Sequence, residues 1–259
     1  MVARILVFAY GVFSYAVFLI CFLYAIGFIG NVAVPKSIDG RPDSPLEYAL
    51  IVNAGLLSVF ALQHSVMARP SFKKWWTRII PESAERSTYT LFSSLALFLL
   101  FAFWEPMGGV VWEIEEPTLR AILHTLFAAG WLIVLATTFL INHFDLFGLR
   151  QVTLFLMGKP YTPLAFKTPG PYRHVRHPLY VGWLMAFWAT PTMTLAHLIF
   201  AVMTTAYILI AIQFEEKDLV TFHGQDYVEY RKATPMLIPK AKRTKLAGKE
   251  ALADESAAI

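Results

Sequence analysis

Hydrophobic residues fall into long runs along this chain, separated by short polar segments. Four runs lie in the amino-terminal part, at residues 5–30, 47–68, 87–104 and 119–141. A helix needs roughly 20 apolar residues to cross the hydrocarbon layer of a bilayer. The pattern therefore predicts four transmembrane helices. The first run is too long for the core of a signal peptide, so we expect it to be retained.

Two shorter apolar runs follow at residues 178–191 and 194–214, with a break around Pro191. Proline suits the first turn of a helix, where its missing N–H is not needed, and Pro178 stands at that position. We expect a helical hairpin whose first arm only partly spans the membrane. Residues 142–177 are too polar to span and too aromatic for a free linker, so we expect a structured cap on the membrane face.

The predicted fold is an all-α polytopic membrane protein with five to six transmembrane helices and a cytoplasmic cap that binds a cofactor. We divide it into three parts. Residues 1–141 form a four-helix transmembrane part, residues 142–240 form a catalytic part with the hairpin, and residues 241–259 form a flexible tail.

The composition agrees with a membrane protein and narrows the chemistry. Apolar residues make up 57% of the chain and charged residues 15%, whereas soluble domains carry about 25% charged residues. The single cysteine, Cys21, excludes a disulfide within the chain and a Cys-based metal site. The sequence contains neither a Gly-rich phosphate loop nor a serine nucleophile elbow, which disfavours a hydrolase.

The basic residues predict the orientation in the membrane. Nineteen of the 22 Lys and Arg residues lie on one side of the predicted helices, and the other three are Lys36, Arg41 and Arg120. Cytoplasmic segments carry such an excess, so we expect both termini and the cap in the cytoplasm. Because the net charge of +4 follows from this distribution, it does not indicate a nucleic-acid partner.

The segment GPYRHVRHPLY, residues 170–180, concentrates polar side chains at the predicted membrane edge. Tyr172 and Tyr180 offer aromatic faces with hydroxyl groups, and Arg173 and Arg176 could hold a carboxylate. Such a density of polar groups favours a ligand site. The same residues could instead be ordinary cytoplasmic arginines and interfacial tyrosines.

Glu215 and Glu216 end the last apolar run, and we expect them at the end of a helix. Acids are unfavourable there because the carboxyl end of a helix already carries partial negative charge. A bound cation would relieve this cost. The alternative is a solvated helix end that Lys217 screens.

Two of the histidines in or beside predicted spans stand among other polar residues on the same side of the membrane: His64 in the second run and His143 just after the fourth. An intramembrane histidine is a candidate functional residue, although it can also serve packing alone. Their spacing matches no helical metal-ligand pair, so we predict no metal site.

The carboxyl-terminal motifs resemble those of the isoprenylcysteine carboxyl methyltransferase and phospholipid methyltransferase superfamily. The resemblance covers about the last 95 residues and rests on RHPLY (176–180), the Glu pair, and a Gly followed by Tyr and a final Pro; these last are Gly224, Tyr227, Tyr230 and Pro239. In the amino-terminal part, QHSVMARPSFKKWW, ERSTY and NHFDLFGLRQ resemble NnrU-like proteins, and most closely the group of bacterial methanethiol S-methyltransferases.

The resemblance implies methyl transfer from S-adenosyl-L-methionine to a small thiol, turning methanethiol into dimethyl sulfide, in the bacterial inner membrane. It implies a small-molecule thiol and membrane lipid as partners, and it leaves the oligomeric state open. It also implies these cofactor-binding residues: Leu164, Ala165, Phe166, Lys167, Tyr172, His177, Pro178, Leu179, Tyr180, Glu215 and Glu216. The chain departs from the prenylcysteine enzymes at Ala211, where they have an arginine for their substrate.

Thiol methylation needs a thiolate, so we expect a base and a nearby cation. His64 and His143 are the candidate bases, and Arg69 or Arg176 could favour the thiolate. Three alternatives remain open: a methyltransferase for a lipid, prenyl-cysteine or quinone; an NADPH-dependent reductase of the sterol-reductase type; and a non-enzymatic helper in nitrogen-oxide metabolism.

Overall fold

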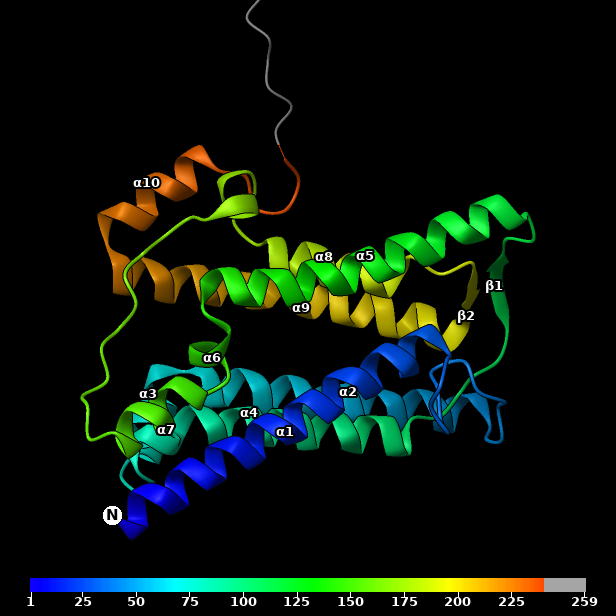
Figure 1. Ribbon diagram of the computed structural model, residues 1–259. Helices are drawn as coiled ribbons and strands as arrows, with labels where there is room; N and C mark the ends of the chain where they lie inside the picture. The colour runs from blue at the N-terminus through cyan, green and yellow to red at the C-terminus, as the bar shows by residue number, and fades with distance from the viewer. Residues whose placement is uncertain (240–259) are drawn as a thin grey trace, which may run out of the picture.

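The computed structural model describes residues 1–239, and the predicted tail at 241–259 lies outside them. Within the described part, five helices are long and apolar enough to cross a membrane. They are α1 (Val2–Gly30), α2 (Leu46–Ala68), α4 (Glu82–Phe103), α5 (Pro117–Ile141) and α9 (Leu195–His223). The helices run along a common direction (Figure 1). The predicted multi-pass helical membrane fold is confirmed.

Helix α8 (Pro178–Trp188) is the short arm of the predicted hairpin. Its 11 residues rise about 16 Å, roughly half of the hydrocarbon thickness. The helix therefore enters the bundle without crossing it. Among the described residues, the expected five to six transmembrane helices are five full spans and one half-span.

The two ends of the bundle differ. One end, near the amino terminus, gathers the short helices, as Figure 1 shows for most of them. These are α3 (Pro70–Trp76), α6 (His143–Leu146), α7 (Leu149–Leu156), η1 (Gly170–Arg173) and α10 (Gln225–Ala233). At the other end β1 (Val110–Glu113) pairs antiparallel with β2 (Thr192–Thr194). This short ladder adds two strands to the helical fold, and its β-branched Val and Thr residues suit a strand.

Two helix boundaries also differ from the sequence expectation. Helix α4 begins at Glu82, five residues before the predicted span, because Pro81 starts it and Glu82 and Glu85 suit the positive end of the helix dipole. Helix α9 continues through Glu215 and Glu216 to His223. The prediction that these acids end the helix is therefore wrong. Gly224, with a φ of 61°, ends it instead.

A cluster of hydrogen-bonded polar side chains connects the loop between α1 and α2 to the start of α9. Asp39 accepts hydrogen bonds from Thr194 and Asn31, and lies 3.2 Å from Nδ1 of His197. The other ring nitrogen of His197 lies 3.0 Å from the carbonyl of Phe187. Since every one of these polar groups has a partner, the group stabilises the end of the bundle that lies away from the motif residues.

Helix α8 carries the RHPLY motif into the bundle by packing tightly on α5, and two glycines permit this. A Cβ on Gly182 would lie 2.8 Å from the carbonyl oxygen of Gly130. We expect Gly182→Ala to destabilise the protein by about 1–3 kcal/mol, because the backbone of α5 would have to move. Thermal melting in detergent would measure this. Gly55→Ala is the matched control, since nothing lies within 4 Å of its Cβ position; equal melting temperatures for both variants would contradict the packing argument.

Candidate active site

The RHPLY motif lies against the segment that follows α10. The backbone N–H of Arg176 donates to the carbonyl of Pro235 at 2.9 Å, and that of His177 donates to Met236 at 3.1 Å. Residues 170–177 and 234–236 thus form one cap over the polar ends of α8 and α9. Figure 1 shows α10 beside this cap.

Arg176 and Glu216 form a buried ion pair at the base of the cap. The guanidinium Nε donates to Oε1 of Glu216 at 2.6 Å, and Nε2 of His177 lies 3.0 Å from the same oxygen. Arg176 also donates through Nη1 to the carbonyls of Arg231 and Thr234. The side chains of Arg176, His177 and Glu216 are only 11%, 5% and 9% exposed. All of these contacts are with protein groups, so the pair holds the cap in place.

Glu215 has a different environment, although it is the neighbouring residue. Consecutive residues of a helix point about 100° apart, so Glu215 faces away from the ion pair. Its Oε2 accepts a hydrogen bond from the hydroxyl of Tyr180 at 2.8 Å, and its side chain is 44% exposed. Within residues 1–239, Tyr180 is its one hydrogen-bond partner. Glu215 is therefore open to a ligand, whereas Glu216 is occupied.

Tyr172 lies close enough to Glu215 to be affected by its charge. Burial raises the pKa of Tyr172, and the negative charge of Glu215 raises it further. The hydroxyl of Tyr230 on α10 donates to the backbone carbonyl of Tyr172, and burial raises the pKa of Tyr230 to about 12. Both phenols are therefore neutral at physiological pH, and Tyr172 can donate a hydrogen bond to a ligand.

The segment before the cap runs extended from α7 to η1, along the outside of the molecule (Figure 1). Phe166 packs on His223, Tyr227 and Tyr230, with ring centroids 5.0–5.9 Å apart. Its neighbours Leu164, Ala165 and Lys167 are exposed. The structure thus places residues 164–167 beside α10 and the end of α9.

His64 lies in a polar group inside the bundle. The hydroxyl of Tyr89 is 2.8 Å from Nε2 and 3.1 Å from Nδ1, and Ser93 Oγ is 3.1 Å from Nδ1. The neighbouring Ser65 pairs with the hydroxyl of Tyr207 on α9 at 3.0 Å. Glu215 is close enough to Tyr89 to act on it electrostatically. His64 therefore belongs to the same region as the Tyr180–Glu215 pair.

His143 lies in a separate aromatic group. Its ring nitrogens contact the hydroxyls of Tyr15 and Thr138, each at 2.8 Å, and its ring stacks on Phe139. Burial lowers its pKa. Within the described chain, none of these partners belongs to the group of His64, Tyr180 and Glu215. The contacts favour His64 over His143 as a residue near the open carboxylate.

Three residues of this region were not among the sequence candidates: Tyr89, Ser93 and Tyr207. Tyr89 belongs to the ERSTY motif, which carried part of the resemblance. A tyrosine at that position could thus have been selected from sequence. Tyr207 offered no such signal, because it lies in an apolar run with no motif around it.

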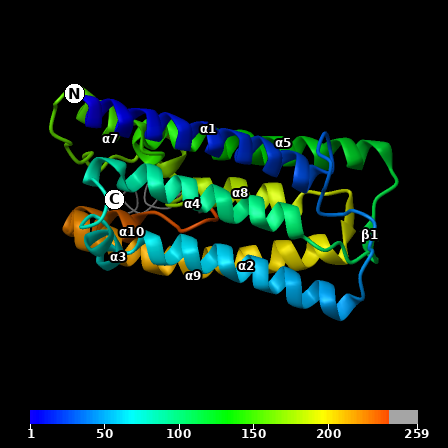
Figure 2. The ribbon, with the colours of Figure 1, turned by 90° about the horizontal axis from the view of Figure 1, so that it is seen from below.

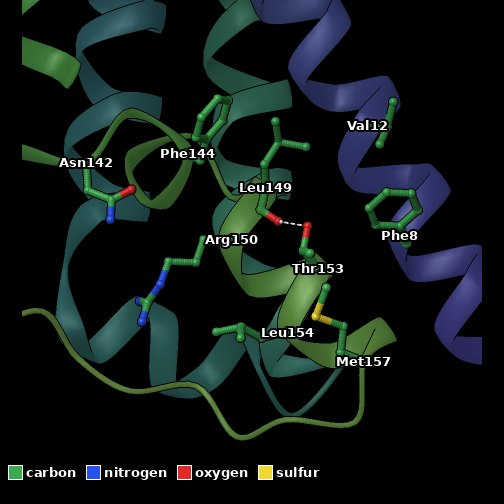
Figure 3. Close-up of a pocket in the computed structure, with 9 residues that line it drawn as sticks. All are labelled: Phe8, Val12, Asn142, Phe144, Leu149, Arg150, Thr153, Leu154 and Met157. Atoms are coloured by element: carbon green, nitrogen blue, oxygen red, sulfur yellow. Dashed lines mark hydrogen bonds between the residues drawn. The ribbon is translucent and has the colours of Figure 1, made fainter.

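Two cavities occur at the end of the bundle with the short helices. One, of about 600 Å³, lies between α1 and α7, and Figure 3 shows the mainly apolar side chains that line it, among them Phe8, Val12 and Leu154. The other, of about 690 Å³, is polar and includes Lys73 and Arg86. Neither cavity includes Tyr172, Tyr180 or Glu215. The polar cavity reaches Arg86, whose guanidinium lies over the ring of Tyr89 at 5.1 Å.

Comparison of the sequence with known proteins identifies the family of the chain. The Phospholipid methyltransferase family matches residues 123–226, which include the RHPLY motif and both glutamates. The chain is 60% identical to a methanethiol S-methyltransferase of Crocosphaera subtropica, over 92% of this chain and 93% of that protein. It belongs to the methanethiol S-methyltransferase family.

Two further relatives are similar to the chain. A methanethiol S-methyltransferase of Mycobacterium tuberculosis is 53% identical over 91% of this chain and 97% of its own length. The Nurim of Bos taurus is 31% identical over 76% of this chain and 80% of its own length. No solved structure matches the chain. The resemblance read from the motifs is confirmed, and membership in a family of methyltransferases decides against the reductase alternative.

Proposed function

We propose that the protein transfers a methyl group from S-adenosyl-L-methionine to methanethiol and releases dimethyl sulfide. The observation that carries the proposal is the open carboxylate of Glu215, which meets the hydroxyl of Tyr180 and lies near that of Tyr172. The names of the relatives, methanethiol S-methyltransferases, support methanethiol as the methyl acceptor. A small apolar thiol reaches such a site readily from the lipid.

The residues around Glu215 suit S-adenosyl-L-methionine. A half-exposed carboxylate can accept hydrogen bonds from ribose hydroxyls or attract a cation. Tyr172 and Phe166 offer aromatic faces, and Leu164, Ala165 and Lys167 continue the same edge of the cap. Pro178 and Leu179 begin α8 beside them. When bound, the donor supplies an electrophilic methyl group on a sulfonium.

The ion pair of Arg176 and Glu216 has a supporting role in this proposal. By fixing the cap to α9, it holds Tyr172 and His177 at the site, and positioning of this kind contributes several kcal/mol to a displacement reaction. From the sequence, Arg176 is a candidate cation for the thiolate. Its bonds to Glu216, Arg231 and Thr234 favour the structural role instead.

The orientation in the membrane follows from the same end of the bundle. The amino terminus, α3 and α10 lie at this end (Figure 2), and each of them carries Lys or Arg residues. Because cytoplasmic segments are enriched in Lys and Arg, this end faces the cytoplasm, where S-adenosyl-L-methionine is made. The bacterial sources of the relatives support an inner membrane as the location in this proposal.

We expect His64→Ala to lower turnover of methanethiol on the order of 10²-fold, because it removes the base that accepts the thiol proton. The assay uses purified protein, labelled S-adenosyl-L-methionine and methanethiol. His143→Ala is the matched control and should retain turnover, because His143 lies in a separate aromatic group.

Binding of S-adenosylhomocysteine, measured by calorimetry, should survive both substitutions. A large loss of turnover in His143→Ala, with none in His64→Ala, would overturn the assignment of the base. Absence of any binding or methyl transfer by the unaltered protein would overturn the function itself.

A further inference from the structure

Tyr89 lies between the candidate base and the candidate cofactor site. It is on α4, in the half that faces the polar end of the bundle. Its hydroxyl is 2.8 Å from Nε2 of His64 on α2. The same hydroxyl is an electrostatic neighbour of Glu215 and of Tyr180. The phenol thus contacts the candidate base directly and lies within electrostatic range of the open carboxylate.

His64 is not free to take a proton directly. Its Nδ1 is 3.1 Å from the hydroxyl of Ser93, and its Nε2 is occupied by Tyr89. The ring also stacks on Phe60, with centroids 5.1 Å apart. When Nδ1–H donates to Ser93, Nε2 is the acceptor and the Tyr89 hydroxyl must be its donor. Such a tautomer leaves the lone pairs of the Tyr89 oxygen available to a further donor.

Arg86 favours negative charge on that oxygen. Its guanidinium lies over the Tyr89 ring at 5.1 Å and is anchored through Nε to the carbonyl of Leu146 at 2.7 Å. A cation over the face of a phenol stabilises charge that gathers on the ring and its oxygen. Glu85 and Glu215 are the acids that act on the same phenol. Burial and these two acids oppose a full negative charge on the Tyr89 oxygen, so a relay through it must deliver one proton as the other leaves.

We propose that Tyr89 relays the proton of the acceptor thiol to His64. The inference rests on the proposed function. As the S–H bond of the thiol breaks, its proton passes to the Tyr89 oxygen, while the proton of that hydroxyl passes to Nε2 of His64. The products are a thiolate and an imidazolium, so charge and atoms balance. The thiolate sulfur then forms the bond to the methyl group, and the methyl–sulfonium bond breaks.

The experiment compares two acceptors of different acidity, and each loss of turnover in Tyr89→Phe is taken relative to the unaltered protein with the same acceptor. Methanethiol must lose its proton in the site, whereas 2,2,2-trifluoroethanethiol is more acidic and is largely ionised at mildly alkaline pH. With methanethiol we expect turnover to fall on the order of 10²-fold, as for loss of a general base. With trifluoroethanethiol at mildly alkaline pH the loss should nearly vanish. Tyr10→Phe is the control, because it removes another tyrosine hydroxyl bond, to Thr88, beside Tyr89.

Equal losses of turnover with both acceptors in Tyr89→Phe would overturn the relay and show a structural role. Unchanged turnover with methanethiol would also overturn it. Calorimetric binding of S-adenosylhomocysteine by the same variant separates this result from a failure of the proposed function. If the unaltered protein neither binds that product nor methylates either thiol, the function fails; if it does both, only the relay is in question.

Discussion

Replacing Glu215 by glutamine is expected to weaken binding of S-adenosyl-L-methionine by about 10- to 100-fold, because a hydrogen bond to a charged group contributes about 1.5–3 kcal/mol. The fold should survive the change. The side chain is 44% exposed. Within the described chain it accepts a hydrogen bond from Tyr180, which an amide oxygen can still accept, and lies 4.0 Å from Nδ1 of His177. Calorimetric titration of the purified protein would measure the affinity.

Glu229→Gln is the matched control for this experiment. Glu229 also lies on the cap side of the bundle, on α10, and is exposed. It removes the same charge at a place where no ligand is proposed, so it reports any general effect of net charge on binding. Equal affinities in Glu215→Gln and Glu229→Gln would remove Glu215 from the site. Loss of affinity in Glu215→Gln alone would support it.

The membrane helices could be predicted because their signal is local. A run of apolar residues such as 119–141 is long enough to predict a transmembrane helix without reference to any other part of the chain. Helix α5 (Pro117–Ile141) matches this run closely. The half-span α8 could also be predicted, because Pro178 and Pro191 mark its two ends. The pairing of β1 with β2 could not be predicted, since it joins segments about 80 residues apart.

The continuation of α9 past Glu215 could not be predicted for the same reason. An isolated helix would favour ending before two adjacent acids, as the dipole argument holds. In the folded protein, Arg176 supplies a cation to Glu216 from a segment 40 residues away. A long-range ion pair thus reverses a local preference. Because the helix continues, the two acids point in different directions and acquire different roles.

The candidate site was predicted in its composition but not in its arrangement. The motifs named Tyr172, His177, Tyr180 and Glu215, and the structure brings these residues together. Sequence could not separate His64 from His143, since both are histidines in or beside apolar runs. Contacts from Tyr89 on another helix make the difference. Whether the assembled residues bind the cofactor stays a prediction.

Breaking the ion pair of Arg176 and Glu216 from one side is expected to destabilise the protein strongly. Both side chains are nearly buried, at 11% and 9% exposed. Removal of one partner leaves an uncompensated buried charge, which typically costs about 3–5 kcal/mol. Arg176→Met and Glu216→Leu should each lower the melting temperature in detergent. Each should also weaken cofactor binding indirectly, because the cap that carries Tyr172 would loosen.

The double variant separates the structural role from a direct contact with the cofactor. With Arg176→Met and Glu216→Leu together, two apolar side chains of similar volume replace two charges, and such replacements are often neutral in stability. Melting should therefore recover above that of either single variant, although His177 loses its bond to Glu216. Cofactor affinity should recover with it if the pair only holds the cap, because Glu215 remains. A double variant that melts no higher than the less stable single variant would refute the role of the ion pair in holding the cap. Recovery of the melting temperature without recovery of cofactor affinity would show that Arg176 or Glu216 contacts the cofactor directly.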